Sequence, residues 1–93
     1  MLNLNDNQFE QLVLALYSGI EIARSKHPRF AEGKYEALGV ISQEVEEFTE
    51  AVERESDKRS IEEALDVMVT CARYIAGDHL PVEDRGFGWW KTR

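Results

Sequence analysis

The chain has 93 residues, a hydrophobic fraction of 43% and a formal net charge of −7. This length predicts a single domain with a modest core, and the apolar content argues against disorder. The negative charge argues against nucleic acid as a partner, because proteins hold its phosphates with clustered Lys and Arg. So small a helical chain has few ways to cover its apolar faces, and we expect a homodimer or homotetramer.

The chain shows no sign of a targeting or membrane segment. Its N-terminus lacks a basic stretch followed by an apolar run, so we expect no signal peptide. No run of about 18 apolar residues predicts a membrane span, and we expect no membrane partner and a cytoplasmic location. The single cysteine, Cys71, lies in an apolar helical run and is interpreted as a small buried side chain.

The first predicted helix runs from about residue 5 to residue 27. Asn5 or Asp6 is a favourable N-cap, and Pro28 disfavours helix at the residue before it. Apolar residues recur every three or four positions, which is the pattern of an amphipathic helix. They are Phe9, Leu12, Val13, Leu16, Tyr17, Ile20 and Ala23.

The second predicted helix runs from about Ala31 to Glu55. Its apolar face consists of Ala37, Leu38, Ile41, Val45, Phe48 and Val52. Gly39 lies inside this helix at a cost of about 1 kcal/mol relative to Ala. Two interpretations stay open for Gly39: it permits close helix packing, or it is a tolerated weak point.

The third predicted helix begins between Asp57 and Ser60, runs to about Ala76, and stops at Gly77. Its apolar stripe consists of Ile61, Leu65, Met68, Ala72 and Ile75. Residues 78–93 show no helical period and contain Trp89 and Trp90, which we expect to dock on the bundle or on a second subunit. No segment has the pattern of a strand. The prediction is one all-α domain, residues 1–93, that forms an antiparallel bundle of three main helices.

Two acidic pairs lie on consecutive predicted helices: Glu44 with Glu47, and Glu63 with Asp66. Residues three apart on a helix are surface neighbours, so each pair places two carboxylates side by side. On a helical wheel Glu44 lies at the edge of the apolar face and Glu47 on the same flank. Four facing carboxylates would suit Mg²⁺ or Mn²⁺, which prefer oxygen ligands.

The second acidic pair lies on the polar side of its helix, opposite the apolar stripe. Glu63 and Asp66 therefore face another helix only if the bundle or a second chain covers that side. A competing interpretation exists for Glu63. The segment from Ser60 to Glu63 fits a capping box, in which the Glu side chain would bond the Ser60 backbone instead of a metal.

The segment from Gln43 to Phe48, followed by the segment from Glu62 to Val67, resembles the MazG-like all-α nucleotide pyrophosphohydrolases. Their signature is Glu-x-x-Glu, a variable gap, then Glu-x-x-Asp, with apolar residues around each pair. The resemblance covers about residues 34–75. This chain departs from many members at Gln43, where they have Glu, and at Leu65, where they have Gly.

The resemblance implies metal-dependent hydrolysis of a nucleoside triphosphate to the monophosphate and pyrophosphate. Carried over by position, Glu44, Glu47, Glu63 and Asp66 would hold Mg²⁺ or Mn²⁺. Glu47 would also act as the general base. Arg73 is the candidate for a substrate phosphate in the third helix, although a partner role for a neighbouring acid is an open alternative. A different class of function also stays open: a non-catalytic helical oligomer whose aromatic C-terminal tail binds a protein.

Overall fold

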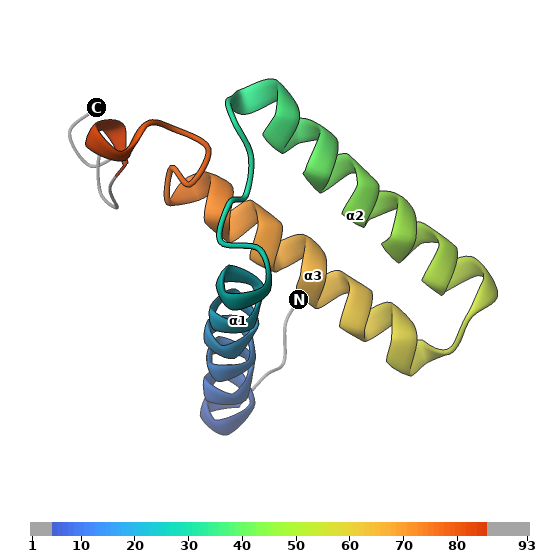
Figure 1. The fold of residues 1–93 in the computed structure, drawn as a ribbon. Helices are drawn as coiled ribbons and strands as arrows, with labels where there is room; N and C mark the ends of the chain where they lie inside the picture. The colour runs from blue at the N-terminus through green and yellow to red at the C-terminus, as the bar shows by residue number, and fades with distance from the viewer. Residues whose placement is uncertain (1–4, 86–93) are drawn as a thin grey trace.

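The computed structural model describes residues 5–85, and within that range it contains helices and no strand (Figure 1). The helices are α1 (Asp6–Lys26), α2 (Lys34–Arg54) and α3 (Asp57–Ile75), followed by the short 3₁₀ helix η1 (Val82–Asp84). Helices α2 and α3 form an antiparallel hairpin, and α1 crosses α3 steeply. The predicted all-α arrangement of three main helices is confirmed. None of the described helices is long and apolar enough to cross a lipid bilayer.

Local capping interactions explain where the helices begin and end. The Asn5 side chain accepts a hydrogen bond from the Gln8 backbone N–H at 2.9 Å, and the Gln8 side chain accepts one from the Asn5 N–H at 3.0 Å. The Ser56 side chain caps α3 in the same way by accepting from the Arg59 N–H. After α3, Gly77 adopts φ +82° and donates its N–H to the Tyr74 carbonyl. These caps confirm the expected limits of α1 and α3 to within a residue or two.

The start of α2 differs from the prediction. Helix α2 begins at Lys34 and not at Ala31. Its N-cap residue Gly33 has φ +86°, which lies outside the helical range, so the helix does not extend back through this residue. The preceding Phe30 and Ala31 are buried in the loop and pack with Ala37 of α2. This loop cluster fixes the position of α2 relative to the end of α1.

Helix packing depends on small residues, although not on the one that the sequence suggested. A Cβ atom built at Gly39 would meet no other described atom within 4 Å, so the interpretation of Gly39 as a close-packing residue is wrong. A Cβ at Gly19 would instead lie 2.9 Å from Val69 Cγ2. Gly19 therefore permits the close approach of α1 to α3. Within the described residues, α1 packs against α3 and not against α2.

The face of α3 that is buried is not the predicted apolar stripe. Ile61 is 69% exposed, and Met68 and Ile75 are also exposed. The buried residues of α3 are Glu63, Val69 and Arg73. Helix α2 packs on the polar side of α3 within the same chain, so no second subunit is needed to bring Glu44 close to Glu63 and Asp66.

Candidate functional site

Three carboxylates converge where α2 packs on α3. One oxygen each from Glu44, Glu63 and Asp66 lies within 4.8 Å of the others. Glu44 occupies the same column of α2 as Ala37 and Ala51, seven residues away on either side, and both alanines are fully buried. The Glu44 carboxylate lies between these two buried positions on the side of α2 that meets Glu63 and Asp66 of α3. We call Glu44, Glu63 and Asp66 the carboxylate cluster.

Glu63 is the most buried member of the carboxylate cluster, at 7% exposure. The capping box is wrong for this residue, since Ser56 caps α3 and the Ser60 hydroxyl donates to the Asp57 carbonyl at 2.8 Å. Glu63 Oε1 accepts a hydrogen bond from Arg59. Its second oxygen, Oε2, is buried without a hydrogen-bond partner among the described residues. A buried carboxylate oxygen without a partner is costly, and a bound cation would satisfy it.

Arg59 is the one basic side chain that contacts the carboxylate cluster in the described structure, and the sequence analysis did not single it out. Besides Glu63, its guanidinium contacts Glu62 at 2.8 Å and Glu55 at 3.5 Å. Glu62 and Glu63 follow Arg59 on α3 by three and four positions, which is the spacing of neighbours on a helix surface, whereas Glu55 is the C-cap residue of α2. The spacing of Arg59 from Glu62 and Glu63 could have predicted these contacts from the sequence. Arg59 neutralises one edge of the carboxylate cluster and leaves the side toward Glu44 without a cation.

The crowding of acids changes the protonation of the cluster. The pKa of Glu44 rises from 4.5 to about 7, first because of its burial and then because of the negative charges of Glu47, Asp66 and Glu63. Burial and the charges of Glu63 and Glu47 also raise the pKa of Asp66, against the opposing charge of Arg59. Without a cation, the cluster therefore retains protons that the same groups lose in water.

These raised pKa values predict that the metal-free protein loses stability as the pH rises. The folded state holds the Glu44 proton more tightly than the unfolded chain does. The resulting stabilisation is complete below pH 4.5 and is lost as the pH rises through about 7. For a half-buried carboxyl the loss should be about 1 kcal/mol, after allowing for screening by solvent. Urea unfolding in EDTA at pH 5 and pH 8 measures it.

Glu44→Gln should reduce this pH dependence, because the amide does not titrate. Glu46→Gln is the matched control, since Glu46 is exposed on the same helix and is not part of the carboxylate cluster. If Glu44→Gln leaves the difference between pH 5 and pH 8 as large as in the wild type, the proton is not held at Glu44.

Glu47 takes a different place from the other three predicted ligands. It is exposed and is not among the three residues whose oxygens converge within 4.8 Å. Its charge nevertheless raises the pKa of both Glu44 and Asp66, so it lies next to the carboxylate cluster. The structure thus brings three of the four predicted ligands together and leaves Glu47 at the solvent side.

A cavity of about 590 Å³ lies beside the carboxylate cluster, between the second half of α1, the loop that follows it, α2 and α3. This volume is within the usual range for small-molecule sites. Glu44 and Asp66 line one part of the cavity, and the cations Lys26 and Arg29 line another. The apolar part of the wall consists of Ile22, Ala23, Phe30, Val40, Leu65 and Val69. The cavity therefore offers acidic, basic and apolar surfaces to one ligand.

Arg73 also lines this cavity, but the described structure gives its charge other partners. The side chain is 5% exposed and its Nε lies 2.6 Å from Asp78 Oδ2. Its Nη2 donates to the His27 carbonyl at 2.9 Å, and the guanidinium lies over the ring of Phe30. Arg73 thus joins the end of α1 to the end of α3. Binding of a substrate phosphate by Arg73 stays a prediction.

Part of the predicted C-terminal tail packs against the end of α3. His79 is buried, stacks on Tyr74 with a ring separation of 4.0 Å, and its carbonyl accepts from the Gly33 N–H. Trp89 and Trp90 lie outside the described residues.

In comparisons with known proteins, no protein-family model, no curated protein and no solved structure matches the chain. The assignment of a function therefore depends on the residues and geometry of the site itself.

Proposed function

We propose that the chain is a Mg²⁺- or Mn²⁺-dependent nucleoside triphosphate pyrophosphohydrolase of the MazG-like kind. The observations that support this best are the convergence of Glu44, Glu63 and Asp66 and the buried oxygen of Glu63, Oε2, that has no hydrogen-bond partner among the described residues. A solvated acidic surface would not explain that oxygen, because its polar atoms would face water. The order of the acids along the chain is also the order in the MazG-like signature.

The chemistry of the residues fits a divalent cation. Glu44, Glu63 and Asp66 supply hard oxygen ligands, which Mg²⁺ and Mn²⁺ prefer. The raised pKa values of Glu44 and Asp66 reflect first their burial and then the negative charge of the neighbouring acids, which Arg59 only partly balances. When bound, the metal supplies charge neutralisation of the phosphates and acidification of water.

The cavity supports a nucleotide as the substrate. Lys26 offers positive charge to phosphate oxygens, as would Arg29 on leaving its ion pair with Glu32, and the apolar wall that includes Phe30 offers a surface to a base. In the proposed reaction, water attacks the α-phosphorus, and the bond from that phosphorus to the bridging oxygen breaks. The products are a nucleoside monophosphate and pyrophosphate. Glu47, which is exposed beside the carboxylate cluster, takes the proton of the attacking water.

Pyrophosphate release from a panel of ribo- and deoxynucleoside triphosphates tests the proposal. We expect release that requires Mg²⁺ or Mn²⁺ and that falls at least about 100-fold in Glu47→Gln, the usual contribution of a general base. Glu46→Gln removes a neighbouring exposed acid and should keep full activity. No release from any member of the panel by folded, metal-binding protein would contradict hydrolysis of triphosphates.

A further inference from the structure

The side chain of Arg59 connects the buried Glu63 to two acids at the surface. Arg59 lies in the first turn of α3, and its backbone N–H donates to the Ser56 side chain that caps this helix. Its guanidinium donates to Glu63 Oε1 and lies 2.8 Å from Glu62 Oε1 and 3.5 Å from Glu55 Oε1. The Arg59 side chain is 48% exposed, whereas Glu63 is buried. A cation at the surface is therefore held in place against a buried acid.

The two oxygens of Glu63 have different surroundings. Oε1 accepts from Arg59, whereas Oε2 is buried without a hydrogen-bond partner within residues 5–85. While Arg59 stays in place, Oε2 is therefore the oxygen that Glu63 can offer to a metal. The metal and the guanidinium would then share one carboxylate, with one cation at each oxygen.

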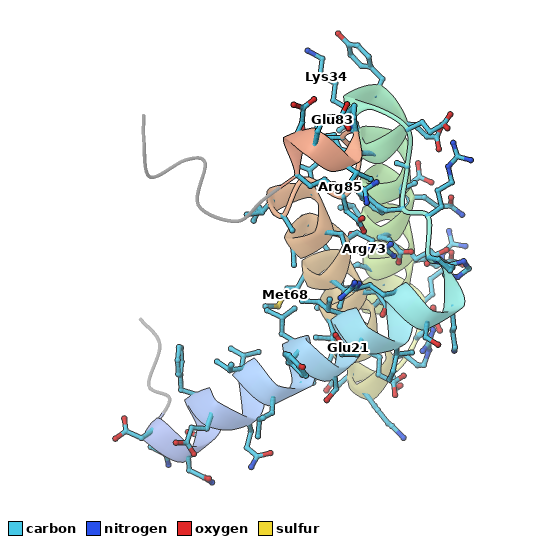
Figure 2. All side chains as sticks on the ribbon, turned by 60° about the vertical axis from the view of Figure 1, so that its left-hand side comes forward. Glu21, Lys34, Met68, Arg73, Glu83 and Arg85 are labelled. Carbon is cyan, nitrogen blue, oxygen red and sulfur yellow. The ribbon has the colours of Figure 1, made fainter. Side chains whose placement is uncertain are left out.

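The charge of Arg59 acts on the carboxylate cluster more directly than that of its basic neighbours on α3. Arg73 lies about four turns further along the helix, beside the end of α1 (Figure 2), and is paired with Asp78. Lys58 is exposed and belongs to none of the ion pairs within the described part of the chain. By contrast, the charge of Arg59 opposes the rise in the pKa of Asp66. The field of Arg59 thus extends beyond Glu63 to a second acid of the cluster.

Two effects of Arg59 on a bound metal would oppose each other. As a donor, Arg59 orients Glu63, and loss of such a donor commonly weakens metal binding. As a positive charge, Arg59 repels the metal. Burial in a packed interior already restricts the Glu63 side chain, so little of its orientation depends on Arg59. Two cations on the two oxygens of one carboxylate are roughly 5 Å apart, where repulsion changes the binding constant of a divalent ion about tenfold even in a water-like dielectric.

We propose that Arg59 is the built-in counter-ion of Glu63, which stabilises the carboxylate cluster while no metal is bound and lowers its affinity for Mg²⁺ or Mn²⁺. This role rests on the metal site of the proposed function and concerns how tightly that site holds its cation. The metal-free protein needs Arg59 because a buried carboxylate without a cation is costly. The metal-bound protein needs it less, because the metal then neutralises the same acids.

Calorimetric titration of Mn²⁺ into metal-free protein tests the proposal, at pH 8, above the pKa of about 7 of Glu44. We expect Arg59→Gln to bind Mn²⁺ about tenfold more tightly than the wild type, because the repelling charge is gone. Arg59→Lys keeps the charge, and its affinity should be closer to that of the wild type than to that of Arg59→Gln. Lys58→Gln is the matched control, since it removes the same charge from the adjacent residue and should leave the affinity unchanged.

Unfolding in urea gives an independent readout of the same effect. In EDTA, Arg59→Gln should be less stable than the wild type, because Glu63 loses its cation. A ligand stabilises the folded state according to its affinity. At saturating Mn²⁺, the ratio between the folding equilibrium constants of the two proteins should therefore narrow by the factor that separates their Mn²⁺ affinities. Circular dichroism checks that each variant is folded.

Several results would overturn the role of Arg59. Equal or weaker Mn²⁺ binding by Arg59→Gln would do so, and weaker binding by Arg59→Lys as well would mean that Arg59 orients Glu63. An equal gain in Lys58→Gln would mean that the metal responds to the overall charge of the chain. If the wild type binds Mn²⁺ and Arg59→Gln binds it no better, the counter-ion role fails alone. A wild type that binds no Mn²⁺ would contradict both this role and the proposed function.

Discussion

Asp66→Asn is expected to abolish the stabilisation of the protein by Mg²⁺ or Mn²⁺. A ligand that binds only the folded state stabilises it by about 2.7 kcal/mol at 100 times its Kd, which for a domain of this size raises the Tm by about 10–20 °C. Asp66 supplies one of the three converging oxygens, and its side chain forms no ion pair with Arg59 in the described structure. Replacing it by an amide therefore removes a ligand without breaking that ion pair.

Without metal, the same variant should be slightly more stable than wild type. The raised pKa of Asp66, caused by burial and by Glu63 and Glu47, shows that its charge is unfavourable there. The order of the two melting temperatures should therefore reverse when metal is added. Differential scanning fluorimetry in EDTA, Mg²⁺ and Mn²⁺ measures both values for each protein.

Glu46→Gln is again the matched control, and its response to metal should equal that of wild type. Equal stabilisation of Asp66→Asn and wild type would mean that the cation acts on the general negative charge of −7 and not on the carboxylate cluster. A wild-type protein that does not respond to either metal would leave the carboxylate cluster as a set of partly protonated acids and would remove the basis for hydrolysis.

Arg73→Met is expected to destabilise the protein by about 2 kcal/mol, less than the usual cost of breaking a buried ion pair, because Arg85 lies 3.8 Å from the Asp78 carboxylate and balances part of its charge. The groups left behind are the Asp78 carboxylate and the His27 carbonyl, both of which accept from Arg73. The guanidinium also packs over Phe30. Because Arg73 joins the end of α1 to the end of α3, amide exchange in α1 should rise more than exchange in α2. Urea unfolding and hydrogen exchange measure the two effects.

Two further variants separate the contributions of Arg73. Arg73→Lys keeps the charge but cannot reproduce the planar set of donors, so its stability should be intermediate. In an Asp78→Asn background, Arg73→Met should cost less than in wild type, because the ion pair is already absent. Unchanged stability in Arg73→Met, together with a higher KM for a nucleotide, would contradict the structural role of Arg73. It would instead support the prediction that Arg73 binds a substrate phosphate.

Local sequence signals were sufficient to predict the three main helices and most of the residues at which they begin and end. Asn5, Ser56 and Gly77 act through hydrogen bonds to residues three or four positions away, so their effects can be read without tertiary structure. The start of α2 was predicted three residues early. The buried loop that contains Phe30 and Ala31 has apolar residues like those of a helix, and only the positive φ of Gly33 marks the true boundary.

The acidic pairs could also be found from spacing, because residues three apart on a helix are always neighbours. Spacing did not show which of the four acids converge. Glu44, Glu63 and Asp66 come together where α2 packs on α3, whereas Glu47 is exposed to solvent. The contact distance between two helices depends on side chains from both, and neither helix specifies it alone.

The sequence by itself therefore determined three helices, their caps and two pairs of neighbouring carboxylates, all of which depend on interactions within about one helical turn. The tertiary structure decided which side of α3 is buried, which partners Arg59 and Arg73 bind, and that the stripe of α1 stays exposed. An apolar stripe indicates that a face needs a partner, but it does not identify the partner. In this chain α2 packs on the side of α3 that carries Glu63, and Arg59 balances part of the charge buried there.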